Sequence, residues 1–420
     1  MEKMIDSNQP MIYQIKVKSH LSSDWTHWFD GLTITPEEDG DTLLTGPVVD
    51  QAALYGLLKK VRDLGMPLIS LNPVQRNEAI PEKGEGKKEG SQAGETFMKA
   101  IVHKKYGSPE VLELIEIEKP TPKDDEVLVQ VRASSVNPAE WYDMIGLFIG
   151  RPQAGLFKPK DPRIGADFAG VVEAVGSRVT EFKPGDEVFG GRGGAFAEYV
   201  CIRAERGIAH KPTNLTFERA AAVPTAAITA LQGLRDYGQI QPGQKVLING
   251  ASGGVGTFSV QIAKEFGAEV TGVCSSRNVD LIRSLGADHV IDYTREDFTK
   301  SGKQYDLLLD IAGSRSWSEY RRVLKPNGIF VLVGAKNSNP LLGPLSHVIK
   351  LRAGSFRASQ KVVFFIAKFN KADMEILREL IESEKVTPFV ERTYPLTETA
   401  DAMRHLGTGH ARGKIVITIK

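Results

Sequence analysis

The stretch LINGASGGVGTFSVQIAKEFGAEVTGVCSSRN, residues 247–278, carries a cluster of glycines between a strand pattern and a helix pattern. The run KVLING is short and apolar, as in a buried strand, and TFSVQIAKEFG has the apolar spacing of an amphipathic helix. AEVTGVC then has the pattern of a second strand. A strand, a turn, a helix and a further strand form a βαβ unit, so this stretch predicts a parallel α/β domain.

Within this unit the glycines follow the spacing Gly250-x-x-Gly253-x-x-Gly256, a variant of the G-x-G-x-x-G pattern of dinucleotide-binding turns. Gly250 permits the tight turn, Gly253 lets the backbone approach a diphosphate, and Gly256 lets the helix pack close to the strand. The N–H groups and the dipole at the helix start form an anion site. We therefore predict a bound dinucleotide in preference to a glycine-rich turn without a ligand. The residues expected to contact it are Gly250, Ala251, Ser252, Gly253, Gly254, Val255 and Gly256.

The end of the second strand indicates which dinucleotide binds. Folds that prefer NAD carry Asp or Glu about 20 residues after the glycines, where the carboxylate binds the 2′-hydroxyl of the ribose. Here the strand ends in CSSRN, residues 274–278, without a carboxylate. Ser275 can donate one hydrogen bond to a 2′-phosphate, and Arg277 can donate two. NADPH is therefore the predicted cofactor, and the alternative is that Arg277 caps a solvated helix start.

The composition of the 420-residue chain is that of an ordinary globular protein, with 41% hydrophobic and 25% charged residues. The net charge of +1 gives no reason to expect nucleic acid or an anionic membrane as a partner. No apolar run is long enough to cross a bilayer, and the N-terminus lacks the apolar core of a signal peptide. Two cysteines exclude a disulfide framework, and we expect a cytoplasmic protein.

A linker divides the chain into a small unit and a large unit. Residues 77–97 are rich in Gly, Glu and Lys and have too little apolar surface to offset the entropy of ordering, which predicts a flexible linker. Residues 1–76 have the pattern β-α-β-β-α-β, which predicts a small ferredoxin-like α+β domain. No catalytic group of residues stands out in this domain.

The large unit is predicted to contain two domains. Residues 98–224 are rich in short strands, glycines and turns, which indicates a β-rich catalytic domain. Residues 225–344 hold the glycine turn and alternate strands with helices, which predicts a Rossmann domain that binds NADPH. Residues 345–420 supply a helix and the final strand KIVITIK, and we expect them to complete the catalytic domain around the inserted Rossmann domain.

Five stretches give the large unit a specific resemblance: ASSVNPAEWYDMIG, GADFAGVVEAVGSRVTEFKPGDEVFGG, AAAVPTAAITALQGL, GASGGVG and GHARGKIVI. In this order they resemble a zinc-free medium-chain dehydrogenase/reductase of the quinone oxidoreductase (zeta-crystallin-like) group, over residues 98–420. The resemblance implies a GroES-like catalytic domain around the inserted Rossmann domain, with the active site in the cleft between them. It also implies NADPH-dependent reduction of a quinone or an α,β-unsaturated carbonyl by a homodimer.

The same comparison bears on metals. Zinc-dependent members of the wider family carry Gly-His-Glu where this chain has GAD, with Ala166 and Asp167 in the last two positions. A catalytic zinc needs about three protein ligands, and a structural zinc needs about four. Cys201 and Cys274 are isolated, and the eight histidines show no ligand spacing, so no metal site is predicted.

The segment SVNPAEWYDMIG is the best source of hydrogen-bond donors for the reacting oxygen. In similar reductases the residues at the positions of Asn137 and Tyr142 line the nicotinamide and substrate pocket. Asn137 would bind the carboxamide, the substrate oxygen or an ordered water, and Tyr142 would donate a proton directly or through water. The alternative is that Tyr142 is only a pocket wall and bulk water supplies the proton. Glu140, where the family often has Asp, is assigned no catalytic role and is expected to hold the loop.

Five further residues are expected at the cofactor, most of them with a structural alternative. Thr225 would start a helix near the nicotinamide, or would only cap that helix. Tyr293 would lie beside the 2′-phosphate, or would be a buried aromatic at a strand end. Gly334 would bring the backbone close to the nicotinamide ribose. His410 and Arg412 would reach back to the cofactor, or would form a basic surface turn.

Two other functions stay open at this level. The protein could be an NADPH-binding sensor or scaffold with little turnover. It could also be an NADP-dependent alcohol/ketone oxidoreductase, which ranks lower because no metal would acidify the alcohol. The small N-terminal domain is expected to mediate association or regulation.

Overall fold

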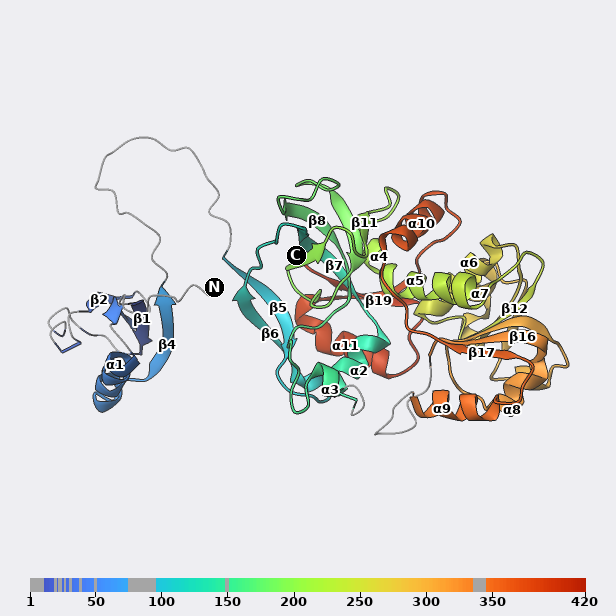
Figure 1. Cartoon of the computed structure of the whole chain (residues 1–420), viewed down its shortest axis with the longest axis horizontal. Coiled ribbons are helices and arrows are strands. Elements are labelled where there is room, and N and C mark those ends of the chain that lie inside the picture. Colours follow the sequence, from blue (N-terminus) through green and yellow to red (C-terminus); the bar gives the residue numbers. More distant parts are fainter. Residues whose placement is uncertain are drawn as a thin grey trace, which may run out of the picture. The chain divides into compact units, whose positions relative to one another are not determined.

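The structure is a computed structural model that describes residues 11–18, 21, 25, 28–29, 32–37, 40–48, 51–74, 96–147, 151–334 and 345–420. Contacts between residues divide the chain into two compact units, Met1–Gln92 and Ala93–Lys420. Figure 1 shows the small unit in blue and the large unit in cyan to red. In the described part of the chain, no helix combines the length and the apolar character that a membrane span requires.

The described part of the small unit is one sheet with one helix. Its elements are β1 (Met11–Val17), β2 (Thr33–Pro36), β3 (Thr42–Val48), α1 (Gln51–Asp63) and β4 (Leu68–Val74). The strand order is β2-β3-β1-β4, and neighbouring strands are antiparallel. The other predicted helix falls on residues 22–31, most of which lie outside the described residues, so the ferredoxin-like class stays a prediction.

The first sheet of the large unit contains strands from both ends of that unit. Its order is β11-β9-β8-β7-β19-β18, and β10 also pairs with β7. The last strand of the chain, β19, runs antiparallel to β7, whose residues Val127, Val129 and Val131 point into the core. A separate antiparallel pair consists of β5 (Phe97–His103) and β6 (Leu112–Glu118). The strands of the sheet are β7 (Glu126–Val136), β8 (Asp167–Val175), β9 (Glu187–Gly191), β10 (Tyr199–Arg203), β11 (Ile208–His210), β18 (Val390–Pro395) and β19 (Lys414–Thr418).

The second sheet of the large unit is parallel and has the order β14-β13-β12-β15-β16-β17. Counted along the chain this order is 3-2-1-4-5-6, that of the Rossmann fold. The order reverses between β12 and β15, and such sheets bind ligands beyond the carboxyl ends of the strands at this point. The strands are β12 (Lys245–Asn249), β13 (Glu269–Cys274), β14 (His289–Asp292), β15 (Tyr305–Asp310), β16 (Leu324–Leu332) and β17 (Lys361–Phe364).

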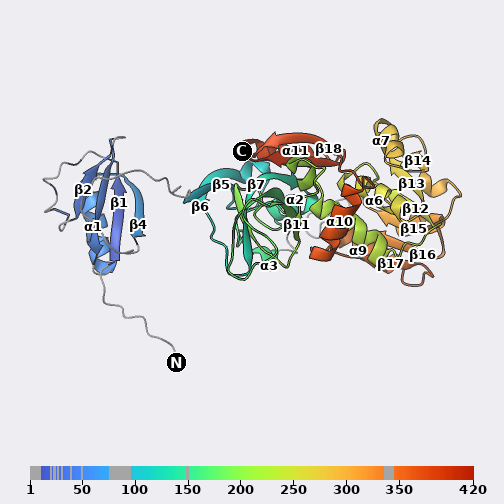
Figure 2. The same ribbon diagram turned by 90° about the horizontal axis from the view of Figure 1, so that it is seen from above.

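A helix of small residues connects the two sheets. It is α5 (Pro224–Gln232), which packs its alanines against α6 (Gly254–Glu265) in a core that also includes Val416 of β19. Figure 1 shows α5 between β19 and β12, and in Figure 2 the two sheets lie side by side along the large unit. The other helices are α2 (Pro138–Ile145), α3 (Arg151–Ala154), α4 (Phe217–Ala221), α7 (Val279–Ser284), α8 (Trp317–Tyr320), α9 (Leu345–Gly354), α10 (Lys371–Glu382) and α11 (Thr399–Gly407).

Candidate cofactor and active site

The glycine turn leaves β12 where the strand order of the parallel sheet reverses. Gly250 has φ +90°, a backbone region that glycine enters without strain. The N–H groups of Gly250 and Ala251 donate to the carbonyl of Val273 at 3.2 and 3.0 Å. Gly253 then caps α6. Because the first N–H groups of a helix have no carbonyl partner within it, this turn offers donors and the positive end of the helix dipole to an anion.

The space around the turn fits a dinucleotide diphosphate. A Cβ on Gly256 would lie 2.2 Å from the carbonyl oxygen of Gly250, so only glycine lets α6 start this close to β12. A Cβ on Gly253 would meet only the same carbonyl oxygen, at 3.6 Å. The backbone at Gly253 therefore borders on open space, which is where a diphosphate would approach the amides.

Asn278 connects this turn to the end of β13. Its buried side chain donates to the hydroxyl of Ser252 at 3.0 Å and to that of Ser275 at 3.2 Å. Its Oδ1 atom is buried and has no hydrogen-bond partner among the described residues. A buried acceptor beside an anion site suits a donor such as a ribose hydroxyl. Sequence analysis did not assign Asn278 a role, because a polar residue after Ser-Ser-Arg signals no more than a helix start.

Arg277 meets the C-terminal segment at the same strand end. Its Nη2 atom donates to the carbonyl of His410. The N–H of Tyr293 donates to the carbonyl of Cys274 at 3.0 Å, and the Tyr293 side chain is 52% exposed. The alternative of a buried aromatic at this position is therefore wrong. Three of the residues predicted at the cofactor, Arg277, Tyr293 and His410, thus lie around the end of β13.

Two further groups shape the charge at this side. Asp292, at the end of β14, accepts hydrogen bonds from Ser276 and Thr294, which lower the pKa of its carboxyl group. Arg295 forms an ion pair with Asp292, in which Nε of the arginine lies 3.4 Å from the carboxylate. Arg277, in contrast, has no carboxylate partner among the described residues. Sequence analysis missed Asp292 because it is the last residue of β14, whereas a carboxylate was expected at the end of β13.

Arg412 follows His410 in the C-terminal segment but is less accessible. Its guanidinium group lies over the ring of Phe389, 5.6 Å from the ring centre, and its N–H donates to Glu391 at 2.7 Å. Its Nε atom is buried without a partner among the described residues. The alternative of a basic surface turn therefore does not describe Arg412, whereas His410 is exposed.

A buried carboxylate holds the loop on the other side of the glycine turn. Asp310, at the end of β15, accepts hydrogen bonds from Asn249 at 2.8 Å, the N–H of Gly313 at 3.1 Å and the hydroxyl of Tyr320 at 2.6 Å. Burial raises the pKa of its carboxyl group to about 6. These bonds fix the path of the chain after β15.

This loop lies between Gly250 of the glycine turn and Gly334, which is expected near the nicotinamide ribose. A Cβ on Gly250 would lie 3.2 Å from the nitrogen of Ala312, and a Cβ on Gly334 would lie 2.3 Å from the carbonyl oxygen of Ile311. The structure therefore places Gly334 beside the glycine turn, as the adjacent carboxyl ends of parallel strands require.

On the catalytic side, Asn137 begins α2 and is buried. Its N–H donates to Glu140 at 2.8 Å, which forms a capping box and gives Glu140 the loop-holding role expected for it. Its side-chain Nδ2 donates to Asp167 at 3.0 Å, and its Oδ1 accepts from the ammonium of Lys414. Both ends of the Asn137 amide are thus bound within the protein, and a direct contact with substrate stays a prediction.

Asp167 is the centre of this polar cluster. It is fully buried and accepts hydrogen bonds from the Ser135 hydroxyl at 2.6 Å and from the Thr225 N–H and hydroxyl at 2.9 and 2.6 Å. Thr225 lies in the first turn of α5, so Asp167 connects that helix to Asn137. Sequence analysis treated Asp167 only as the residue that replaces a zinc ligand, because nothing local shows which distant donors surround it.

Glu140 should make stability depend on pH. Burial, and then the charge of Asp167, raise the pKa of its carboxyl group from 4.5 to about 7. The pKa of the Glu140 carboxyl group is thus higher in the folded state than in the unfolded state. Its contribution to the free energy of unfolding is therefore full below about pH 4.5 and is lost as the pH rises through 7. We therefore expect Glu140→Gln to gain stability relative to the wild type by up to about 1.4 kcal/mol per pH unit across this window, measured by urea denaturation. Glu181→Gln, at an exposed site, is the control, and a pH-independent difference for Glu140→Gln would contradict the assignment.

Tyr142 lies on α2, five residues after Asn137. Its side chain is half-buried, and burial raises the pKa of its phenol. No hydrogen bond of its hydroxyl to another described residue is present. The phenol is therefore protonated at neutral pH and available as a donor.

The cysteines lie in different sheets. Cys201 is on β10 and Cys274 on β13, both are buried, and burial raises the pKa of each thiol to about 11. Among the described residues, no group of three His, Cys, Asp or Glu side chains is arranged to hold a metal ion.

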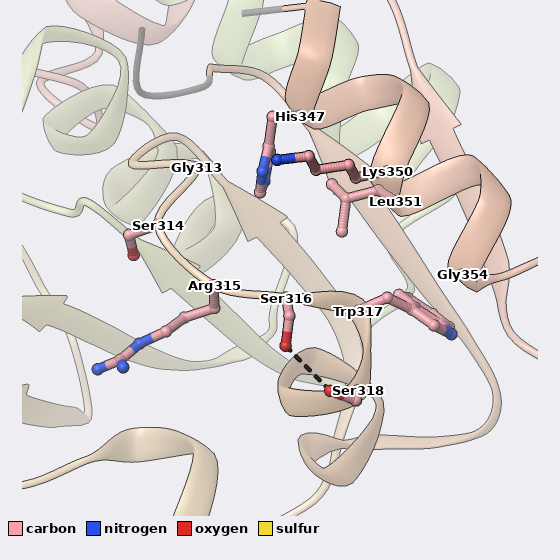
Figure 3. A pocket seen from close by; sticks show the side chains of 10 residues that line it. All are labelled: Gly313, Ser314, Arg315, Ser316, Trp317, Ser318, His347, Lys350, Leu351 and Gly354. Carbon is pink, nitrogen blue, oxygen red and sulfur yellow. Dashed lines mark hydrogen bonds between the residues drawn. The ribbon is translucent and has the colours of Figure 1, made fainter. Parts of the chain in front are cut away.

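A cavity of about 560 Å³ opens beside the loop after β15, between α8 and α9 (Figure 3). Figure 3 shows the Lys350 ammonium next to the ring of His347. Burial, and then the charge of Lys350, lower the pKa of His347, so its imidazole is neutral at pH 7. None of the residues predicted from the sequence lines this cavity, and one of its lining residues, Gly313, donates to the carboxylate of Asp310.

Comparison with protein families gives matches in both units of the chain. Residues 123–213 match the alcohol dehydrogenase GroES-like domain, and residues 285–417 match a family described as zinc-binding dehydrogenase. Residues 12–72, in the small unit, match a domain of unknown function.

Individual relatives cover the large unit. The mitochondrial NAD(P)H oxidoreductase RTN4IP1 of Mus musculus is 32% identical over 78% of this chain and 91% of its own length. The chloroplast quinone-oxidoreductase homolog of Spinacia oleracea is 33% identical over 76% of this chain and 98% of its own. The 2-methylene-furan-3-one reductase of Solanum lycopersicum is 34% identical over 76% of this chain and 79% of its own. Among solved structures, the quinone oxidoreductase from Coxiella burnetii is 30% identical, with a TM-score of 0.67, and covers 77% of this chain and 100% of that one.

Proposed function

Because the chain belongs to the medium-chain dehydrogenase/reductase family, with quinone oxidoreductases among its relatives, we propose that it transfers a hydride from NADPH to a quinone or an α,β-unsaturated carbonyl without zinc. It is an NAD(P)H-dependent oxidoreductase of the quinone oxidoreductase and alkenal reductase type. The observation that carries the proposal is the glycine turn at the reversal of strand order, with its open space at Gly253.

NADPH is proposed over NADH because of the end of β13. Arg277 is the charged residue there, and it has no carboxylate partner among the described residues. Ser275 adds a hydroxyl, which is held in place by Asn278. A doubly charged 2′-phosphate gains charge-assisted hydrogen bonds from this pair, whereas a 2′-hydroxyl gains much less.

Chemistry without zinc is proposed from the donor set. Where zinc-dependent relatives carry a ligand pair, this chain has Ala166 and Asp167. Both oxygens of Asp167 already accept hydrogen bonds from donors of the protein. The thiols of Cys201 and Cys274 are protonated at neutral pH, and thiolates are the form that binds zinc. The name of the family that residues 285–417 match, zinc-binding dehydrogenase, therefore does not describe the donors present in this chain.

Different residues bind the cofactor, bind the substrate oxygen and position the helix that carries Tyr142. The nicotinamide, when bound, supplies the hydride. The N–H groups in the first turn of α6, from Gly254 to Gly256, hold the diphosphate, because those of Gly250, Ala251 and Gly253 already donate to carbonyls of the protein. Arg277 with Ser275 holds the 2′-phosphate. Tyr142 donates a hydrogen bond to the substrate oxygen and so stabilises the negative charge that develops there. Asn137, held in its capping box with Glu140, sets the start of the helix that carries Tyr142.

The test is NADPH oxidation by the full chain with a panel of quinones and α,β-unsaturated ketones and aldehydes. We expect Tyr142→Phe to lower kcat by roughly 10- to 100-fold, because it removes the proton donor, while the Kd for NADPH stays within about twofold. Tyr55→Phe, at an exposed site of the small unit, is the matched control. Tight NADPH binding without turnover of any compound would contradict the enzyme proposal and favour the sensor. An unchanged kcat in Tyr142→Phe would contradict only the role of the tyrosine.

A further inference from the structure

Lys414 is a buried cation at the first position of β19. Its side chain is 3% exposed. Its ammonium donates to Oδ1 of Asn137 and to the carbonyl of Val136 at 3.1 Å, and it lies 3.7 Å from the carboxylate of Asp167. The partners come from β7, from the start of α2 and from β8, so one ammonium group connects three elements of the catalytic domain.

The aliphatic stem of Lys414 contacts the Rossmann domain. A Cβ on Gly254 would lie 2.9 Å from Cδ of Lys414, so the aliphatic part of the lysine packs directly on the first residue of α6. The N–H of the preceding residue, Gly413, donates to the carbonyl of Ser252 at 2.8 Å. The glycine turn and Asn137 therefore contact the same short segment, although 277 residues separate Asn137 from Lys414.

A buried charge at this place is costly and needs a physical reason. Moving an ammonium out of water costs several kcal/mol, which a partner returns only in part. Burial accordingly lowers the pKa of Lys414, while the charges of Asp167 and then Glu140 oppose this effect. A neutral apolar residue would fill the same space at lower cost. Only a donor, however, can hold the Asn137 oxygen while the amide nitrogen faces Asp167, and that arrangement selects one of the two amide orientations.

From this geometry we propose that Lys414 is a positioning residue for hydride transfer, which holds the amide of Asn137, and with it the start of α2, against the glycine turn. Lys414 does not touch the substrate. It acts through Asn137 and α2 on Tyr142, the group proposed to meet the substrate oxygen. For its effect on turnover, this inference rests on the proposed function.

The test compares Lys414→Met with the wild-type full chain. Methionine keeps the apolar stem beside Gly254 and removes the ammonium. We expect kcat to fall at least tenfold, the Kd for NADPH to stay within about threefold, and the α2 amides to exchange hydrogen faster than in the wild type. Lys211→Met is the matched control, because Lys211 is also buried and donates to the carbonyls of Pro212 and Leu215, away from this cluster. The control should lose stability without a comparable loss of kcat.

Removing both charges separates positioning from charge pairing. In Asp167→Asn/Lys414→Met no unpaired buried charge remains at this pair, and the Asn137 amide is free to turn over. We expect stability to recover towards the wild type, while kcat stays low and α2 exchange stays fast. This variant also carries the test if Lys414→Met does not fold. A kcat within twofold of the wild type in either folded variant, or unchanged α2 exchange, overturns the inference. A wild type without turnover contradicts the proposed function instead, and hydrogen exchange of α2 then decides the role of Lys414.

Discussion

Replacing Gly256 with alanine should abolish NADPH binding and destabilise the protein. The new Cβ would lie 2.2 Å from the carbonyl oxygen of Gly250 and 2.6 Å from the backbone of Ala251, and backbone atoms cannot turn aside as a flexible side chain can. The start of α6 must therefore move away from β12, and its N–H groups move with it. Overpacking of this kind costs about 1–3 kcal/mol of unfolding free energy. We expect the Kd for NADPH to rise at least 100-fold, measured by fluorescence titration.

Two other glycines distinguish loss of binding from loss of fold. At Gly253 a Cβ would meet only one oxygen, at 3.6 Å, and alanine is less favourable than glycine at this N-cap position. Gly253→Ala should therefore lower the melting temperature less than Gly256→Ala does and still weaken NADPH binding by occupying the open space in front of the turn. At Gly193, away from the turn, a Cβ would meet nothing within 4 Å, and alanine there should change neither quantity. Normal NADPH binding by Gly256→Ala would show that the diphosphate does not rest on this turn.

Replacing Arg277 with alanine should remove most of the preference for NADPH over NADH. The guanidinium group lies at the end of β13 and is bound only to the carbonyl of His410 among the described residues, which leaves its other donors for a phosphate. A hydrogen bond to a charged group contributes about 1.5–3 kcal/mol. The Kd for NADH divided by the Kd for NADPH should therefore fall by roughly 10- to 100-fold. The loss should come from weaker NADPH binding, with NADH binding little changed.

A neighbouring arginine provides the control for this experiment. Arg283 on α7 is exposed and lies 3.5 Å from Asp280, so Arg283→Ala changes the net charge equally without touching the strand end. If both variants lower the ratio equally, the preference arises from the general field of the domain. If neither variant changes it, Arg277 only caps a helix start, and the proposal of NADPH loses its main support.

The fold of the large unit and the family could be predicted from the sequence, and both are confirmed. The predicted end of the Rossmann domain at residue 344 is wrong, because β17 (Lys361–Phe364) pairs with β16 and extends the parallel sheet beyond it. The glycine spacing, the strand before it and the helix after it are signals between residues close together in the sequence. Such signals are enough to predict a βαβ unit. The parallel sheet with the order 3-2-1-4-5-6 and the match to the alcohol dehydrogenase GroES-like domain agree with this reading. The cofactor and catalytic residues stay predictions, although the structure brings Arg277, Tyr293 and His410 to one strand end.

What the sequence determined by itself was therefore the chemistry that depends on neighbours along the chain: the turn, the missing carboxylate after β13 and the loop-holding role of Glu140. The tertiary structure alone decided that Asp167, Glu140 and Lys414 share one buried cluster with Asn137. The physical reason is that the free energy of a charged group depends on the groups and the solvent around it. Those surroundings are set when β19 pairs with β7 and packs beside the start of α6. A lysine in the pattern GKIVI is an ordinary charged residue until folding removes its water and places its ammonium beside the Asn137 amide, the Val136 carbonyl and the Asp167 carboxylate.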